Sequence, residues 1–277
     1  MKKVESLREL NRIVQKPNYK KVGNWMARNI TRDMALPLTW IVLYLPASAN
    51  SVTFISLIVG LLGCIFLSFG AEIHFLWGAI LLQSWYLLDH VDGQIARYRK
   101  QESVTGIFFD YITHHIIHMG IFIGVGWGVY SHTSEVKYIL FGTISAMSIL
   151  FLNLIYDCQY KAFFHRLGEK KLSKTDGNKK YHATSNNFKS KRAFWSRPKI
   201  IFTWVHKICE VHVLMNILTG LAIIQYFLKG YLWSIFISFY LICTFIVFAL
   251  KMTYFIFKHV PDITFQEFVK SIFIDEK

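Results

Sequence analysis

Three aspartates and a histidine form the pattern in this 277-residue sequence that is best suited to chemistry. Asp89 and Asp92 stand at i and i+3, and Asp110 and His114 at i and i+4, so each pair would share one face of a helix. A short turn separates the two segments, so antiparallel helices would bring these faces together. Converging carboxylates repel one another unless cations lie between them, and hard oxygen ligands favour Mg²⁺ or Mn²⁺. The spacing therefore predicts a divalent metal site.

Small residues accompany these acidic groups. Ala96 shares the helical face of Asp89, and Gly106 lies one helical turn before Asp110. Together with Gly93, they would let a ligand or a neighbouring backbone approach the acidic residues closely.

The segment from Asp89 to His114 resembles the signature of the CDP-alcohol phosphotransferase (CDP-alcohol phosphatidyltransferase) family, D-x2-D-G-x2-A-R-x8-G-x3-D-x3-D. It matches in every position but the last, where His114 replaces an aspartate. Residues 24–60 look like the family's amphipathic N-terminal helix, followed by a P-N-x-x-T element that reads Ala49-Asn50-Ser51-Val52-Thr53 here. The resemblance covers most of the chain, but the 161–207 segment has no counterpart in the compact members of the family.

The resemblance implies a reaction and assigns roles in it to individual residues. Family members split a CDP-linked alcohol, so that CMP leaves and the alcohol phosphate passes to a hydroxyl of a second substrate. Asp89, Asp92 and Asp110 would then hold the metal or metals that clamp the pyrophosphate. The resemblance assigns substrate binding to Asn50, Thr53, Gly93, Ala96, Arg97, Ser103 and Gly106.

His114 is the one departure from the signature. An imidazole keeps the basicity needed to deprotonate the acceptor, with an ordinary pKa of about 6.5, but it gives up a negative charge. A second metal would be held more weakly or through nitrogen, which Mn²⁺ or Zn²⁺ tolerates better than Mg²⁺. We expect His114 to be the base or a base and metal ligand, with Mg²⁺ or Mn²⁺ as cofactor and Zn²⁺ less favoured. His118 follows one turn later, and there a helix-to-helix hydrogen bond is the simpler role.

Composition places this chemistry in a membrane. The chain is 53% hydrophobic with a formal net charge of +14, and its mean hydropathy is +0.35. Apolar runs long enough to cross a bilayer exclude a soluble nucleic-acid-binding protein, and so much apolar surface excludes a disordered basic tail. We expect an all-α, polytopic membrane protein without a nucleic-acid partner. Its six predicted spans are 50–69, 74–95, 107–130, 136–157, 211–228 and 231–257.

The basic residues predict the orientation of these spans. Nearly all of them lie in the first 33 residues, the turn after Arg97, the 161–207 segment or the C-terminal tail. By the positive-inside rule, both termini and the metal site face the cytosol. The first 33 residues are charged and carry no apolar core of a signal peptide.

The same patterns divide the chain into four parts. Residues 1–48 form a cytosolic and interfacial amphipathic segment, 49–160 hold four spans with the motif, 161–207 form a basic cytosolic loop, and 208–277 hold two spans and the tail. The 13 Lys and Arg of the loop fit either a solvated loop or a surface for anionic lipids or a phosphorylated substrate. Asp157, Glu210 and His212 lie at the depth of the motif, where they could line an acceptor pocket or simply lie in the membrane interface.

Several functions remain open from the sequence. A donor such as CDP-diacylglycerol would require a small hydroxyl acceptor, whereas a soluble CDP-alcohol could serve a lipid, a polyol phosphate or a glycan. A membrane protein that binds nucleotide or lipid without catalysis is the main alternative. A transporter fits less well, because the acidic cluster lies at one membrane face and not at the midplane. A homodimer is compatible with the sequence.

Overall fold

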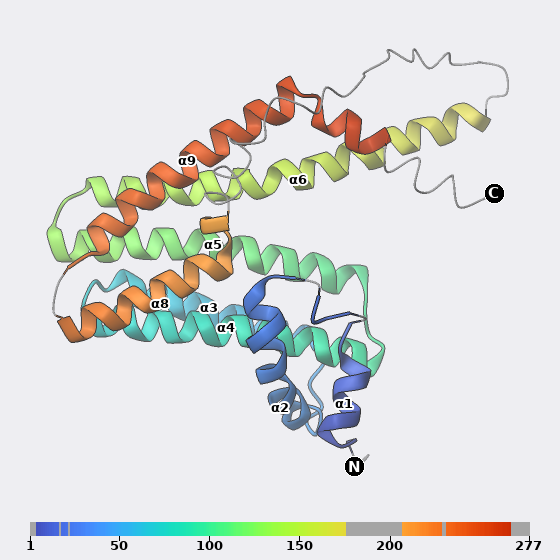
Figure 1. Cartoon of the computed structure of the whole chain (residues 1–277), viewed down its shortest axis with the longest axis horizontal. Helices are drawn as coiled ribbons and strands as arrows, with labels where there is room; N and C mark the ends of the chain where they lie inside the picture. The colour runs from blue at the N-terminus through green and yellow to red at the C-terminus, as the bar shows by residue number, and fades with distance from the viewer. Residues whose placement is uncertain (1–3, 17, 22, 176–206, 229–230, 267–277) are drawn as a thin grey trace. The chain divides into compact units, whose positions relative to one another are not determined.

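The computed structural model describes residues 4–16, 18–21, 23–175, 207–228 and 231–266, and these contain helices and turns without any strand (Figure 1). The all-α prediction is therefore confirmed. The chain divides into two compact units. The first consists of Met1–Met147 and Glu210–Leu241, and the second of Ser148–Cys209 and Ile242–Lys277.

The centre of the first unit is a group of three helices, α3 (Ala49–Ser68), α4 (Glu72–Arg99) and α5 (Val104–Thr133). Helix α3 packs against both α4 and α5. Close approach depends on glycine: a Cβ at Gly63 would lie 3.2 Å from the Gly78 carbonyl oxygen of α4, and one at Gly124 would lie 2.4 Å from the Cys64 carbonyl oxygen of α3. Helix α3 therefore sets the positions of the two helices that carry the motif.

A tight turn reverses the chain between α4 and α5. Lys100 takes a left-handed conformation at the end of α4, with a φ of 53°. Ser103 then begins α5 by accepting a hydrogen bond from the Gly106 amide at 3.0 Å, an N-cap contact. The reversal places the last turns of α4 beside the first turns of α5.

The N-terminal segment packs on the same end of α4. It contains α1 (Leu7–Val14), η1 (Ala27–Thr31) and α2 (Arg32–Val42). A capping box of Ser6 and Glu9 begins α1, and the buried side chains of Leu10 and Val14 join a hydrophobic cluster with Val91 and Ile95 of α4.

Buried polar contacts also fix α2 on α4. The amide nitrogen of Gln94 donates to the Arg32 carbonyl oxygen at 3.0 Å, and its amide oxygen accepts from the Thr39 hydroxyl at 2.7 Å. Because both ends of this buried amide are satisfied, the register between α2 and α4 is defined.

The remaining helices are α6 (Lys137–Thr175), α8 (Val211–Leu228) and α9 (Trp233–Phe257). In the first unit, α8 packs on α4, and Trp233 stacks on Phe75 with ring centroids 4.0 Å apart. In the second unit, the Lys251 ammonium lies 3.9 Å from the centre of the Tyr156 ring.

Five helices within the described ranges are long and apolar enough to span a membrane: α3, α5, α6, α8 and α9. They indicate an integral membrane protein. Helix α4 has 28 residues but is more polar, since it carries Asp89, Asp92 and Arg97. The predicted count of six spans is thus supported for five helices and stays a prediction for 74–95.

The 161–207 segment differs from the expected loop. Helix α6 continues to Thr175, so residues 161–175 are helical. The predicted span of 136–157 ends where the hydrophobic run ends, but charged residues such as Lys161 and Arg166 are compatible with a helix once it leaves the lipid. Residues 176–206 lie outside the described residues.

Substituting Gly124 by alanine tests the packing of α5 on α3. The added Cβ would clash with the Cys64 carbonyl, so overpacking should cost about 1–3 kcal/mol and lower the melting temperature in detergent. Gly220→Ala is the control, because a Cβ there meets nothing within 4 Å. Alanine favours a helix over glycine, so this variant should melt at the parent temperature or above it. Equal melting temperatures for the two variants would contradict the packing described.

Candidate functional site

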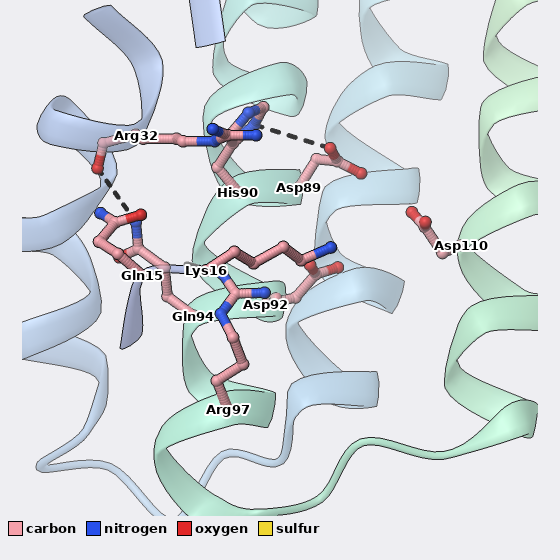
Figure 2. A pocket seen from close by; sticks show the side chains of 10 residues that line it. Gln15, Lys16, Arg32, Asp89, His90, Asp92, Gln94, Arg97 and Asp110 are labelled. Carbon is pink, nitrogen blue, oxygen red and sulfur yellow. Dashed lines mark hydrogen bonds and ion pairs between the residues drawn. The ribbon is translucent and has the colours of Figure 1, made fainter. Parts of the chain in front are cut away.

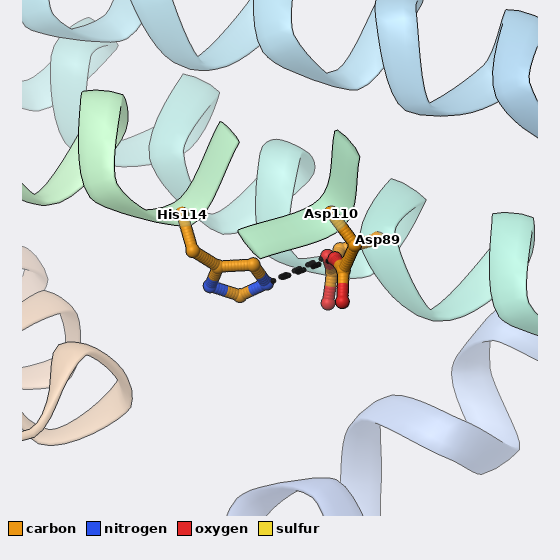
Figure 3. A group of neighbouring side chains, drawn as sticks. All are labelled: Asp89, Asp110 and His114. Atoms are coloured by element: carbon orange, nitrogen blue, oxygen red, sulfur yellow. Dashed lines mark hydrogen bonds and ion pairs between the residues drawn. The ribbon is translucent and has the colours of Figure 1, made fainter. Parts of the chain in front are cut away.

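Asp89 of α4 meets Asp110 and His114 of α5 between the two helices (Figure 3). One ligand atom from each residue lies within 4.8 Å of the others. The Nε2 atom of His114 is 2.9 Å from Asp89 Oδ1 and 3.4 Å from Asp110 Oδ1. Two carboxylates thus converge on one imidazole nitrogen.

This donor set fits a divalent cation. Adjacent ligands of an octahedral ion, each about 2.1 Å from the metal, are about 3.0 Å apart. The separations of 2.9 Å and 3.4 Å around His114 Nε2 are close to that spacing. Carboxylate oxygens with one imidazole nitrogen suit Mn²⁺ well and leave coordination positions for a phosphate. The nitrogen can hold either a proton or a metal ion, so protons and metal compete for it.

Aromatic and polar neighbours hold these side chains in place. The Trp85 ring packs edge-on against His114 with centroids 5.2 Å apart. The His90 Nδ1 atom lies 3.0 Å from the Tyr86 carbonyl oxygen and 3.7 Å from Asp89 Oδ2. These contacts restrict the rotamers of the residues that flank Asp89.

Asp92 lies outside this three-residue group. Its side chain is buried, and its Oδ2 accepts a hydrogen bond from the Thr53 hydroxyl of α3 at 2.6 Å. Thr53, which the sequence analysis assigns to substrate, therefore contacts a predicted metal ligand directly. A hydrogen bond that fixes a ligating carboxylate is a common feature of metal sites.

The three aspartates line one cavity of about 190 Å³ (Figure 2). Its walls are Gln15, Lys16, Arg32, Asp89, His90, Asp92, Gly93, Gln94, Arg97 and Asp110. The carboxylates of α4 and α5 thus share the cavity with the cationic side chains of Lys16, Arg32 and Arg97. A Cβ on Gly93 would lie 3.4 Å from Arg97 Nη1, so the glycine keeps the space beside that guanidinium open.

The other predicted substrate residues are not part of the cavity wall. A Cβ on Gly106 would be 3.3 Å from Ser103 Oγ and 3.4 Å from Asn50 Oδ1, so these three residues adjoin each other at the helix ends. Ala96 packs against the hydrophobic cluster of Val91 and Ile95. Among the described residues, these four do not line the cavity.

Five of the cavity residues were not predicted from the sequence: Gln15, Lys16, Arg32, His90 and Gln94. His90 stands beside Asp89 and could have been suspected. The contribution of Gln15 and Lys16 had no local signal, because it depends on where α1 packs.

Other groups singled out in the sequence lie elsewhere. His118 is buried in α5. The His212 Nε2 atom lies 3.2 Å from Glu210 Oε2, and neither residue belongs to the described cavity wall. Asp157 is in the second unit, so its role as an acceptor residue stays a prediction.

Comparison with known proteins adds one match. The family model for CDP-alcohol phosphatidyltransferase matches residues 47–174, a range that contains α3, α4, α5 and nearly all of α6. The comparison with curated proteins gives no match. The N-terminal segment with α1 and α2 lies outside the matched range.

Binding of Mn²⁺ can be tested without an activity assay. A metal that binds the folded protein raises its melting temperature by mass action, so Mn²⁺ should stabilise the parent protein. Asp89→Asn and Asp110→Asn should abolish that increase, because each removes a charged oxygen ligand. Asp262→Asn is a matched control, since Asp262 has a side chain that is 78% exposed and lies in the other unit. An unchanged Mn²⁺ response in Asp110→Asn would contradict the site.

Proposed function

Residues 47–174 belong to the CDP-alcohol phosphatidyltransferase family, and from this membership we propose that the chain transfers a substituted phosphate from a CDP-linked alcohol to an acceptor hydroxyl. CMP is the second product. The observation that carries the proposal is the convergence of Asp89, Asp110 and His114 in the family-matched region. The proposed setting is lipid biosynthesis, and the donor and acceptor are proposed only as chemical classes.

Divalent metal use is common to the family, and the residues present fit such an ion. Asp89, Asp110 and His114 would hold it, with Asp92 beside them. A bound ion would supply positive charge that offsets the negative charge of the two phosphates. Because one donor is nitrogen, we propose Mn²⁺ or Mg²⁺ with Mn²⁺ favoured.

The proposed transfer forms one bond to phosphorus and breaks another, and a side chain of the cavity stabilises the charge that develops. The acceptor hydroxyl oxygen attacks the phosphorus on the alcohol side, and the bond from that phosphorus to the CMP oxygen breaks. CMP leaves with the electron pair of that bond, and the hydroxyl proton passes to a base. Arg97, a wall of the cavity, supplies a fixed cation for the charge that builds on the phosphates.

His114 has two candidate roles that use the same atom. As a ligand, Nε2 binds the metal together with Asp89 and Asp110. As the base, Nε2 accepts the hydroxyl proton, and the two carboxylates stabilise the imidazolium that forms. The distances of 2.9 Å and 3.4 Å from Nε2 to the two carboxylates are compatible with both roles. We adopt the ligand role because these distances match the spacing of metal ligands, and the hydroxyl proton then passes to a carboxylate of the cavity wall such as Asp92.

We also propose that the site and both termini face the cytosol. This orientation is supported by the concentration of Lys and Arg in the N-terminal segment and after α4. The cytosol is also where a soluble CDP-alcohol or CMP would exchange with the cavity.

Release of CMP from a panel of CDP-alcohols by the purified protein tests the function. The parent should release CMP only with Mn²⁺ or Mg²⁺ and an acceptor alcohol, and Asp110→Asn should abolish release. His114→Ala should lower the rate by about 10²–10⁴-fold, whether the residue is ligand or base. His114→Asp restores the family residue and should retain more activity than His114→Ala.

The same variants separate the remaining alternatives. If His114 is a ligand, His114→Ala should also weaken Mn²⁺ binding, whereas loss of turnover at unchanged Mn²⁺ affinity would identify a base. A protein that is stabilised by CDP but releases no CMP with any donor would be a non-catalytic binder. Full turnover in Asp110→Asn would contradict the proposed metal chemistry.

A further inference from the structure

We infer that the first part of the N-terminal segment, residues 4–16, completes the donor site and that Lys16 binds the diphosphate of the CDP-alcohol. This inference rests on the proposed function, since it names a binding residue for the same site. The segment lies before the family-matched range of 47–174. No part of the signature points to it.

Contacts along α4 fix the segment at the cavity. The Tyr98 hydroxyl donates to Glu5 Oε2 at 2.5 Å and keeps the pKa of Glu5 below its ordinary value, so this acceptor stays charged at neutral pH. The Arg97 Nε atom donates to the Val14 carbonyl oxygen at the end of α1. Together with the buried side chains of Leu10 and Val14, these contacts hold the end of α1 beside Arg97.

The next two residues after α1 are cavity walls. Gln15 and Lys16 line the same cavity as Asp92, Gly93 and Arg97. Lys16 points into this cavity from the side opposite α5 (Figure 2). A side chain far from the motif in sequence therefore reaches the position where a phosphate would lie between the metal ligands and Arg97.

Lys16 differs from the other two cations of the cavity in how it is held. The Arg97 guanidinium donates to the Val14 carbonyl oxygen, and Arg32 Nη1 donates to the Tyr19 carbonyl oxygen at 2.5 Å. Both arginines are therefore restrained by backbone. Lys16 is exposed and has an ammonium with three donors on a flexible stem, which suits it to follow a charged ligand.

Charge balance supports a diphosphate as the ligand. Three carboxylates already line the cavity, so an additional anion would be repelled unless cations face it. A metal ion can offset part of this charge, and the cations of the N-terminal segment face the cavity from the other side. The diphosphate is the most highly charged part that all CDP-alcohols share.

Equilibrium binding of CDP tests this inference without turnover. CDP is titrated into the full-length protein in detergent with Mn²⁺, for the parent and for Lys16→Gln, Lys16→Arg and Arg12→Gln. Loss of a charged hydrogen bond should weaken CDP binding about tenfold in Lys16→Gln. Lys16→Arg should bind nearly as tightly as the parent. Arg12→Gln removes the same charge from an exposed position on α1 that is outside the described cavity wall, so it should leave CDP affinity unchanged.

Each other outcome overturns a defined part of the account. If the parent binds CDP and Lys16→Gln binds it equally well, the inference fails and the proposed function stands. If Lys16→Gln and Arg12→Gln weaken binding to the same extent, the effect is one of general charge, and the inference also fails. If the parent does not bind CDP with Mn²⁺, the proposed function fails as well. Melting temperatures without ligand verify that the variants are folded.

Discussion

Repulsion among three carboxylates is the constraint on which the rest of this structure depends. Asp89, Asp92 and Asp110 line one cavity, and such groups remain ionised together only where cations or hydrogen-bond donors face them. His114 faces two of them, and the Thr53 hydroxyl faces the third. A divalent ion can take the place of the proton at His114. The same repulsion that would destabilise an empty cluster thus makes it a cation site.

The fold meets this constraint through α3. Helix α3 packs on both α4 and α5. Glycines at these contacts let the helix backbones approach each other closely, because no side chain lies between them. It also supplies Thr53 directly to Asp92. On the far side of α4, Gln94 and Arg97 bind the N-terminal segment, which brings further cations to the cavity. A change in the packing of α3 or α1 is therefore expected to alter the site without touching a ligand.

Much of the site could be predicted because its residues are close in sequence and follow helical spacing. Asp89, Asp110 and His114 needed only a short turn to meet, and the observed reversal after Arg99 provides it. The partner of Thr53 and the position of Lys16 could not be predicted, because both depend on tertiary packing between distant segments. The prediction of a loop at residues 161–175 was wrong. It rested on the polar composition of the segment, but α6 continues through it.

The central claim is that His114 Nε2 and two carboxylates hold the divalent ion, and pulsed electron paramagnetic resonance of bound Mn²⁺ tests it most directly. The parent should show coupling of Mn²⁺ to a histidine nitrogen. The coupling should disappear in His114→Gln and persist in His90→Gln. His90 is a suitable control because its Nδ1 atom lies 3.7 Å from Asp89 Oδ2 in the parent protein. Bound Mn²⁺ without nitrogen coupling in the parent, or with coupling that survives in His114→Gln, would contradict the account.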